Sequence, residues 1–363
     1  MINLMEEVPM KHIYSQFRLD GRVIDCARTG GGHINRTYLV VTGKPHLYIL
    51  QWLNGQVFKD LTGLMNNVIA VTDYLHDRVE DPRGCLTLVP TLSGDPYLKT
   101  AEGDVWRMYE YILDSVCLEA AESAEDLRQS GVAFGMFQNL LADYPAHTLT
   151  ETIPHFHDTP DRFRIFREAI AADRACRLES VRDEVNRYLS REAEADALHA
   201  LLRKGEIPLR VTHNDTKLTN VMLDEATREP LCVIDLDTVM PGLAAHDYGD
   251  AIRFGASTAA EDEPNLDKVE MSLEMYEAFT AGFLSACGDR LVDKEIETLP
   301  LGAKLMTLEC GVRFLTDYLN GDVYFATHRP GQNLDRALTQ FKLVEDMEKK
   351  WDEMNAVIAR LKK

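Results

Sequence analysis

The segment 209–237 constrains the fold of this chain more than any other, because it places short strand-like runs inside a region that otherwise has helical spacing. The run 209–212 predicts one strand, and the runs 221–224 and 231–234 predict a hairpin. The loop between the first strand and the hairpin reads HNDTKLTN. Because the second hairpin strand ends just before Asp235, that carboxylate is expected to return beside the loop.

Three polar side chains of this segment have the types and the order that a phosphoryl-transfer site needs. Asp215 would accept the proton of an acceptor hydroxyl, while Asn220 and Asp235 would hold Mg²⁺ against the phosphates of a nucleotide. Amide and carboxylate oxygens are the hard ligands that Mg²⁺ takes. Asp and Asn also populate ordinary turns, which is the alternative interpretation, but the hairpin that follows favours the catalytic one.

Residues 211–257 resemble the kinase core of the aminoglycoside phosphotransferase superfamily, and within it the chain is most similar to the N-acetylhexosamine 1-kinases. The His-x-Asp loop is typical of the whole superfamily. The hexosamine branch is indicated by four further segments: GGHIN at 31–35, IPHFHD at 153–158, ECGVRF at 309–314 and YFAT at 324–327.

This resemblance implies an α+β, protein-kinase-like fold with a small β-rich N-terminal lobe and a larger, mostly helical C-terminal lobe. It also implies a kinase that uses ATP and Mg²⁺ to phosphorylate the anomeric C1 hydroxyl of N-acetylglucosamine or N-acetylgalactosamine. A different acceptor, such as homoserine, choline or an aminoglycoside, would keep the chemistry and change the pocket. A sugar-binding pseudokinase without turnover is the alternative from outside the enzymes.

The order of the predicted elements agrees with a small lobe of this kind. We expect the lobe boundary near residues 111–114, which divides the chain into a nucleotide-binding lobe at 1–112 and a catalytic, substrate-binding lobe at 113–363. The predicted small lobe has strands at 23–27, 37–41 and 47–50, a helix at 58–77, and strands at 86–92 and 106–112; the predicted helices that follow lie at 124–143, 160–175 and 180–204.

The bulk composition excludes several classes of partner. A chain of 363 residues with 45% apolar residues can bury a large core. A formal net charge of −20 argues against nucleic-acid or anionic-membrane partners, although not against ATP, which needs only a local positive pocket. Seven scattered cysteines form no metal-ligand pairs, and no long apolar run or signal-like start is present. We therefore expect a cytoplasmic protein, and the resemblance implies a sugar and ATP as its partners.

The nucleotide is expected to contact a glycine-rich turn and a hinge strand. Gly30, Gly31 and Gly32 would let a loop lie close over phosphates with its N–H groups facing them, although a plain hairpin turn also explains a triple glycine. The resemblance implies that the strand carrying Tyr109 and Tyr111 reads the adenine base through its backbone.

One position departs from the kinase pattern. The third strand of a kinase carries a Lys that holds the α- and β-phosphates and pairs with a Glu on the following helix. Gln51 stands at that position here, and the helix offers Asn66 and Asn67, so a neutral amide pair is expected as a structural tie. Lys217 is the candidate for the missing charge at the transferred phosphoryl group; a solvated surface Lys is its alternative.

The resemblance assigns three residues to the acceptor sugar: His33, Arg313 and Tyr324. Forked donors and aromatic faces suit sugars, but Arg313 could instead form an ordinary ion pair with a neighbouring acid. The resemblance also implies that Asp247 supports the site by accepting backbone N–H groups of the catalytic loop. His213 and Asp237 are expected to support the site as well, and Asp237 could assist the metal or orient the sugar.

Two further patterns have alternative interpretations. His155 and His157 could suggest a metal site, but no third ligand is apparent, and Asp158-Thr159-Pro160 predicts a helix cap instead. The last helix carries apolar residues from Val344 to Leu361 at spacings of three and four. We expect this face to dock on its own lobe rather than on a second copy, which predicts a monomer or a weak homodimer.

Overall fold

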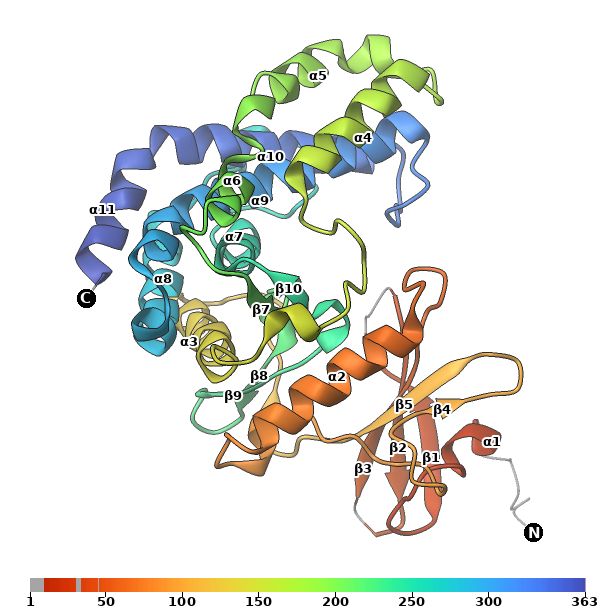
Figure 1. The fold of residues 1–363 in the computed structure, drawn as a ribbon. Coiled ribbons are helices and arrows are strands. Elements are labelled where there is room, and N and C mark those ends of the chain that lie inside the picture. Colours follow the sequence, from red (N-terminus) through yellow and green to blue (C-terminus); the bar gives the residue numbers. More distant parts are fainter. Residues whose placement is uncertain (1–9, 31–33, 45, 363) are drawn as a thin grey trace.

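The computed structural model describes residues 10–30, 34–44 and 46–362, and its N-terminal part is built on one antiparallel sheet (Figure 1). The sheet has the strand order β1-β2-β3-β5-β4. In β3 the fully buried residues alternate with less buried ones, whereas β5 is buried along almost its whole length. The strands are β1 (Val23–Arg28), β2 (Arg36–Thr42), β3 (Leu47–Trp52), β4 (Leu98–Lys99) and β5 (Val105–Glu110).

Helix α2 (Leu61–His76) follows β3 and packs against both this sheet and the C-terminal part of the molecule. The Asp60 side chain caps its first turn by accepting the Gly63 N–H at 2.8 Å. Leu64 and Val68 are fully buried on one face of the helix. They belong to an apolar cluster that also contains Leu236 and Val239, so the core is continuous across the expected lobe boundary.

The strand predicted at 86–92 is wrong. This segment forms only isolated bridges, at Leu88 with Tyr109 and at Thr91 with Phe17. Pro90 has no N–H to donate to a ladder, so a continuous strand is interrupted there. The place of a regular edge strand is taken by β4, which has only two residues.

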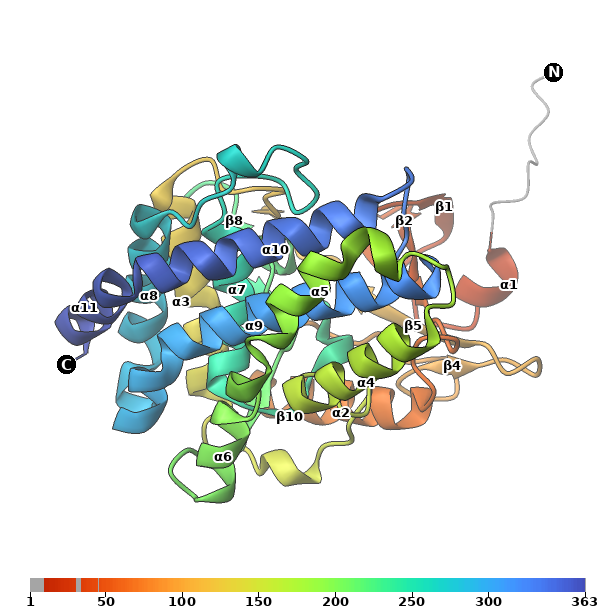
Figure 2. The same cartoon turned by 90° about the horizontal axis from the view of Figure 1, so that it is seen from above.

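The C-terminal part is mostly helical, with short strands that carry the loop of interest (Figure 1). Helices α9 and α10 run side by side beneath α5 in the view of Figure 2. The helices are α3 (Ala124–Leu140), α4 (Thr159–Ala172), α5 (Arg182–Leu189), α6 (Ala197–Arg203), α7 (Ala244–Gly255), α8 (Leu273–Cys287), α9 (Asp293–Asn320), α10 (Gln332–Lys349) and α11 (Trp351–Leu361), and the strands are β6 (Ser115–Val116), β7 (Arg210–Thr212), β8 (Val221–Asp224), β9 (Pro230–Val233) and β10 (Met240–Gly242).

Helices α7 and α9 cross at a contact that only glycine permits. A Cβ on Gly249 of α7 would lie 2.4 Å from the carbonyl oxygen of Gly302 on α9. This close approach fixes α7, whose buried residues include Asp247 and Asp250. Because α9 is 28 residues long and largely buried, α7 has a rigid support.

Two predicted helices are divided. The helix expected at 180–204 becomes α5 and α6, and the Ser190 hydroxyl at the break donates to the Arg187 carbonyl at 2.6 Å, a local bond that competes with helix continuation. The last helix becomes α10 and α11, which meet at Lys350. Its apolar face is nevertheless buried within the same chain, with Met347 and Met354 fully covered.

No helix in the described part of the chain is both long and apolar enough to cross a bilayer. All seven cysteines are free thiols, and Cys176 is the one that is exposed.

Candidate active site

The loop between β7 and β8 brings Asp215 and Asn220 together. The Asn220 side-chain N–H donates to the Asp215 carbonyl at 2.8 Å and to its carboxylate oxygen Oδ2 at 3.2 Å. Because the amide nitrogen makes both of these bonds, the amide oxygen of Asn220 is available to a further ligand. The side chain of Asp215 is 26% exposed, so a solute can reach its carboxylate.

Asp247 supports this loop from α7. Its carboxylate accepts the backbone N–H of His213 at 2.9 Å and that of Asn214 at 2.7 Å, and Gln138 donates to it at 2.8 Å. Burial raises the pKa of Asp247, while these donors oppose that shift. Asn214 has a left-handed φ of 64°, a conformation that costs free energy and persists only where the surroundings hold it. Asp247 therefore contributes directly to the shape of the loop.

His213 joins the loop to the strand that precedes Asp235. Its Nδ1 accepts the Asp215 N–H at 3.3 Å, and its Nε2 lies 2.8 Å from the Ile234 carbonyl, which fixes Nε2 as the protonated nitrogen. The Ile234 N–H also donates to the Asn220 carbonyl at 2.9 Å. Asp235 follows with a left-handed φ of 62°. These bonds place the two candidate metal ligands on adjacent, mutually fixed segments.

Asp235 is a partly solvent-exposed residue whose carboxyl group lies close to other acidic side chains. Desolvation by the surrounding protein and the carboxylates of Asp237 and Asp215 raise its pKa to about 6. Such a group gains by binding a cation, because the cation offsets the repulsion among the acids. The site thus fits a hard divalent ion held by Asp235 and the amide oxygen of Asn220, with other positions left for phosphate oxygens.

This donor set differs from an all-protein metal cage. Within the residues that the structure describes, no group of three or more His, Cys, Asp and Glu side chains gathers as for a metal ion. Mg²⁺ commonly takes only one or two carboxylates and shares the remaining positions with water and substrate phosphates. The predicted pair of protein ligands is therefore compatible with Mg²⁺ and nucleotide, and less so with a structural metal.

The side chain of Lys217 contacts another residue of the same loop. Its Nζ lies 2.7 Å from Oδ1 of Asp215, and its side chain is 40% exposed. Burial lowers the pKa of Lys217, but the carboxylates of Asp215 and Asp250 together raise it more, so the net shift is upward and the side chain is held as a cation. Phe254 lies beneath the ammonium group at 5.6 Å from the ring centre.

Gln51 has a partner that the sequence did not predict. The Arg107 Nε donates to the Gln51 side-chain oxygen at 2.9 Å, and the two residues are directly opposite in the pairing of β3 with β5. The expected amide tie to Asn67 is wrong, because Asn67 bonds to backbone groups of Thr150 and to the Val239 carbonyl. An arginine inside the apolar strand VWRMYE was the signal that could have found Arg107.

Arg107 in turn contacts Asp237. Its Nη1 lies 2.5 Å from Oδ1 of Asp237, and both side chains are almost completely buried. The other oxygen of Asp237 accepts the side-chain N–H of Asn35 at 2.5 Å. Asp237 therefore faces the N-terminal sheet rather than solvent, although the sequence suggested a role near the metal or the sugar.

The nucleotide-binding candidates lie in different surroundings. Gly30 has a φ of +75° and open space where a Cβ would stand, whereas Gly31, Gly32 and His33 lie outside the described residues. The Tyr109 backbone is paired with Ile49 inside the sheet, and its hydroxyl is buried without a hydrogen-bond partner. Tyr111 is 36% exposed, where the chain leaves the sheet.

Arg313 lies between two aromatic rings. Its guanidinium carbon is 5.2 Å from the ring centre of Phe156 and 5.5 Å from that of Phe325. No hydrogen bond or ion pair engages it within the described part of the chain, so the ion pair considered from the sequence does not form. Tyr324, which packs edge-on against Phe325, is 64% exposed. Arg313 thus presents unpaired donors in an aromatic setting.

The buried acid beneath Arg313 is fully engaged. Glu309 accepts from the His157 ring at 2.9 Å and from the Thr159 hydroxyl at 2.7 Å. The other nitrogen of His157 lies 3.3 Å from the Asn214 carbonyl in the catalytic loop. Asp158 caps α4 by accepting the Asp161 N–H at 3.1 Å, which confirms the predicted cap.

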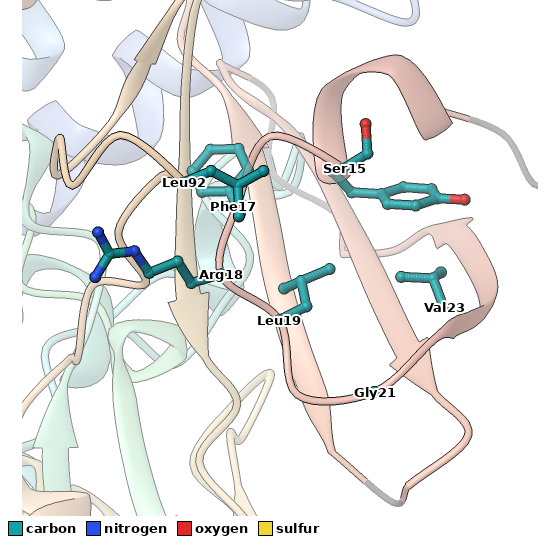
Figure 3. A pocket seen from close by; sticks show the side chains of 8 residues that line it. Ser15, Phe17, Arg18, Leu19, Gly21, Val23 and Leu92 are labelled. Atoms are coloured by element: carbon teal, nitrogen blue, oxygen red, sulfur yellow. The ribbon is translucent and has the colours of Figure 1, made fainter.

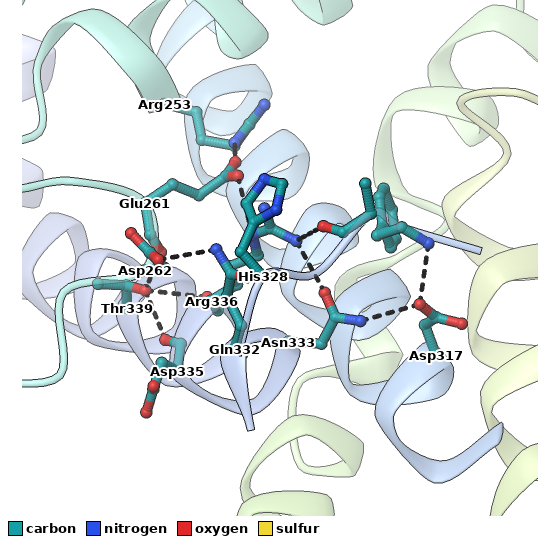
Figure 4. Close-up of polar contacts among 12 residues, drawn as sticks. Arg253, Glu261, Asp262, Asp317, His328, Gln332, Asn333, Asp335, Arg336 and Thr339 are labelled. Carbon is teal, nitrogen blue, oxygen red and sulfur yellow. Dashed lines mark hydrogen bonds and ion pairs between the residues drawn. The ribbon is translucent and has the colours of Figure 1, made fainter. Parts of the chain in front are cut away.

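A polar network holds the loop that follows α9 (Figure 4). Asp317 accepts the backbone N–H groups of Val323, Tyr324 and Phe325, and Asn333 donates to Asp317 at 2.9 Å. The network continues from Asn333 through Arg336, Glu261 and Arg253 to Asp250, which accepts the Thr216 N–H in the catalytic loop. Sequence reasoning did not assign this network, because its members are distant in the chain.

A cavity of about 440 Å³ lies elsewhere, beside the short helix α1 (Lys11–Tyr14) (Figure 3). Phe17, Leu19, Val23 and Leu92 line it. None of the candidate site residues that the structure describes lines this cavity, so it is separate from the loop that carries Asp215.

A small antiparallel sheet joined to a larger helical part, with the HxD loop beside the join, is the arrangement of a kinase-like fold. The model of the phosphotransferase enzyme family, APH, matches residues 25–281, which is more than half of the chain. The chain therefore belongs to this family, and the predicted α+β, kinase-like fold is confirmed.

Solved structures agree with this fold. A microcompartment-associated aminopropanol kinase is 16% identical with a TM-score of 0.59, over 94% of this chain and 96% of that one. An amicoumacin kinase in complex with AMP-PNP, Ca²⁺ and Ami is 13% identical with a TM-score of 0.63, over 93% and 91%. An aminoglycoside phosphotransferase from Alicyclobacillus acidocaldarius is 13% identical with a TM-score of 0.63, over 99% and 100%.

Proposed function

We propose that this chain is an ATP- and Mg²⁺-dependent kinase that phosphorylates the anomeric C1 hydroxyl of an N-acetylhexosamine. The observation that carries the proposal is the convergence of Asp215, Asn220 and Asp235 on adjacent, hydrogen-bonded segments. The family membership supports phosphoryl transfer, and the similar amicoumacin kinase was solved with a nucleotide analogue and a divalent cation. Seven free cysteines support a cytoplasmic setting.

Asp215 is the proposed base. Its exposed carboxylate would accept the proton of the sugar hydroxyl, which contributes roughly 10²–10⁴-fold to such reactions. The ion pair with Lys217 fixes the direction of that carboxylate before the sugar arrives. Asn220 and Asp235 would hold the metal ion, which when bound supplies positive charge to the phosphate oxygens. Most of the acceleration is then expected from positioning and fixed charge.

We assign the nucleotide to the side of the site formed by residues 1–112 and the chemistry to residues 113–363. Gly30 would contact phosphates, and adenine would lie against the end of the strand near Tyr111, which is 36% exposed, whereas the Tyr109 backbone is paired inside the sheet. Gln51 would act through Arg107 rather than by touching phosphate itself.

The acceptor assignment rests on Arg313. Its unpaired, forked donors beside Phe156 and Phe325 suit the hydroxyl and amide oxygens of an N-acetylated sugar. Arg162 lies close enough to affect it, since burial and the charge of Arg313 lower the pKa of Arg162. Two neighbouring guanidinium groups disfavour a cationic acceptor such as choline or an aminoglycoside, because like charges repel. A sugar is therefore preferred over the amino alcohols that similar kinases use.

The test is a coupled assay of ADP release with N-acetylglucosamine, N-acetylgalactosamine, homoserine and choline, with product identified by ³¹P NMR. We expect a sugar 1-phosphate and no turnover by Asp215→Ala. Glu225→Gln, on the exposed turn between β8 and β9, serves as the control and should retain activity. Turnover of choline or homoserine but of neither sugar would reject the acceptor. Sugar binding without any turnover would favour the pseudokinase.

A further inference from the structure

Within the described part of the chain, three residues that lie close together between the sheet and the helical part each have a buried polar atom without a well-aligned hydrogen bond. These atoms are Nη1 of Arg107, the hydroxyl of Tyr109 and Oδ1 of Asp237. Nη1 and Oδ1 are 2.5 Å apart, so they form an ion pair without the alignment of a hydrogen bond. Arg107 also lies over the Tyr109 ring at 5.1 Å. Buried polar groups are usually hydrogen-bonded, so a group in this state calls for a physical explanation.

The contacts of this group cross from one part of the molecule to the other. Arg107 on β5 is held by Gln51 on β3, whose amide nitrogen is 3.2 Å from the Thr37 hydroxyl on β2. Asn35, just before β2, donates to Asp237 and accepts the Asn54 N–H at 3.1 Å. Arg107 and Asn35 thus contact one carboxylate of the helical part directly, and residues of β3 and β2 are linked to it through Arg107.

That carboxylate belongs to the same short turn as a proposed metal ligand. Asp237 lies in a single 3₁₀ turn (Leu236–Thr238) that begins directly after Asp235. Both oxygens of Asp237 are occupied, and its side chain is 4% exposed, so it cannot itself reach a metal ion or a sugar. Arg107 is 1% exposed and likewise cannot reach a phosphate.

We propose that Arg107, Gln51, Asp237 and Asn35 form a lobe clasp, in which Arg107 is a positioning residue that sets Asp235 for the metal–nucleotide complex. In protein kinases the strand-three Lys, paired with the helix Glu, holds the α- and β-phosphates. The clasp does not touch phosphate, and its proposed role is to fix the sheet against the metal-binding segment. The cation, Arg107, is on β5, which pairs with β3, and the acid, Asp237, is in the turn after Asp235 rather than on α2. This inference rests on the proposed function, because it assumes that Asp235 binds the metal.

The proposed clasp predicts an effect on ligand affinity that a purely stabilising ion pair would not have. Loss of Arg107 leaves a buried, uncompensated acid, so any variant there loses some stability. If Arg107 also sets Asp235, the affinity for metal–nucleotide should fall while the affinity for the sugar is kept. Arg210 offers a matched control, because it forms a similarly buried pair with Glu295 at 2.6 Å, between β7 and the start of α9.

The experiment compares Arg107→Met, Arg107→Lys, Arg210→Met and the double variant Arg107→Met/Asp237→Asn. Calorimetric titration with AMP-PNP and Mg²⁺, separate titration with N-acetylglucosamine, and thermal unfolding are measured for each. We expect Arg107→Met to bind AMP-PNP with Mg²⁺ at least tenfold more weakly and the sugar unchanged, and Arg107→Lys to recover part of the affinity. The double variant should regain thermal stability without regaining nucleotide affinity.

Two results would overturn the clasp. One is wild-type affinity for AMP-PNP with Mg²⁺ in a folded Arg107→Met protein. The other is an equal loss of nucleotide and sugar affinity in Arg107→Met and Arg210→Met, which would mean that both pairs only stabilise the fold. If the wild-type protein binds AMP-PNP with Mg²⁺ but phosphorylates no N-acetylhexosamine, the proposed acceptor fails and the clasp is still tested by the nucleotide titrations.

Discussion

Substitution of Glu309 by Gln should remove a buried charge that depends on its donors. Glu309 on α9 is completely buried and accepts from His157 and Thr159. Burial alone would raise the pKa of this carboxyl, but His157, Arg313 and Arg162 lower it from 4.5 to about 2. The substitution keeps the shape of the side chain and removes the titration.

The magnitude follows from the shift. A pKa that is lower in the folded protein contributes stability that is present above pH 4.5 and is lost as the pH falls towards 2. The difference between 4.5 and about 2 corresponds to about 3 kcal/mol at neutral pH. At pH 3 the same two values leave roughly half of that contribution.

The assay is urea unfolding of the wild-type protein and Glu309→Gln between pH 7 and pH 3. The difference in unfolding free energy should be largest at pH 7 and should shrink by about half at pH 3. Glu225→Gln, on an exposed turn, should show no comparable dependence. A difference for Glu309→Gln that stays constant over this range would refute the claim that the donors around Glu309 determine its ionisation.

Three further substitutions test the catalytic segment. Asp235→Asn should raise the Tm of the ligand-free protein at pH 7.5, because the folded pKa of about 6 makes the ionised carboxylate unfavourable there, and it should abolish the stabilisation by AMP-PNP with Mg²⁺ that thermal unfolding measures. Lys217→Met should lower kcat far more than the affinity for ATP; an unchanged kcat in steady-state kinetics would contradict its role beside Asp215. Asp247→Ala leaves the N–H groups of His213 and Asn214 buried without an acceptor, at about 1–3 kcal/mol each, so urea unfolding should show a loss of several kcal/mol.

Local patterns predicted the elements that their own residues determine. Strands β1, β2 and β3 and helix α2 appear close to their expected limits, because alternation and helical spacing are carried within each segment. The prediction of a strand at 86–92 was wrong because Pro90 has no N–H to donate to a neighbouring strand, which the spacing of apolar residues does not take into account. The helix at 180–204 failed because a local Ser190 bond and tertiary packing override helical propensity.

For the site too, the residues that a local segment brings together were predicted, and those that depend on distant contacts were not. Asp215, Asn220 and Asp235 could be named because one loop and one hairpin bring them together. Arg107 could not be paired with Gln51 and Asp237, since those contacts depend on strand register and on the packing of the two parts. The polar network that holds the Phe325 backbone was missed for the same reason, as its members come from segments that are far apart in the sequence.

Helix α2 has a consequence for regulation. In protein kinases the helix after the third strand is repositioned to switch the enzyme on or off. Here Asn67 ties that helix to Thr150 and Val239, and Leu64 and Val68 are sealed in a core that both parts share. An outward movement of α2 would break these hydrogen bonds and expose the apolar core to water. This chain is therefore expected to be constitutively competent, with its rate governed by the supply of its substrates rather than by a signal that moves the helix.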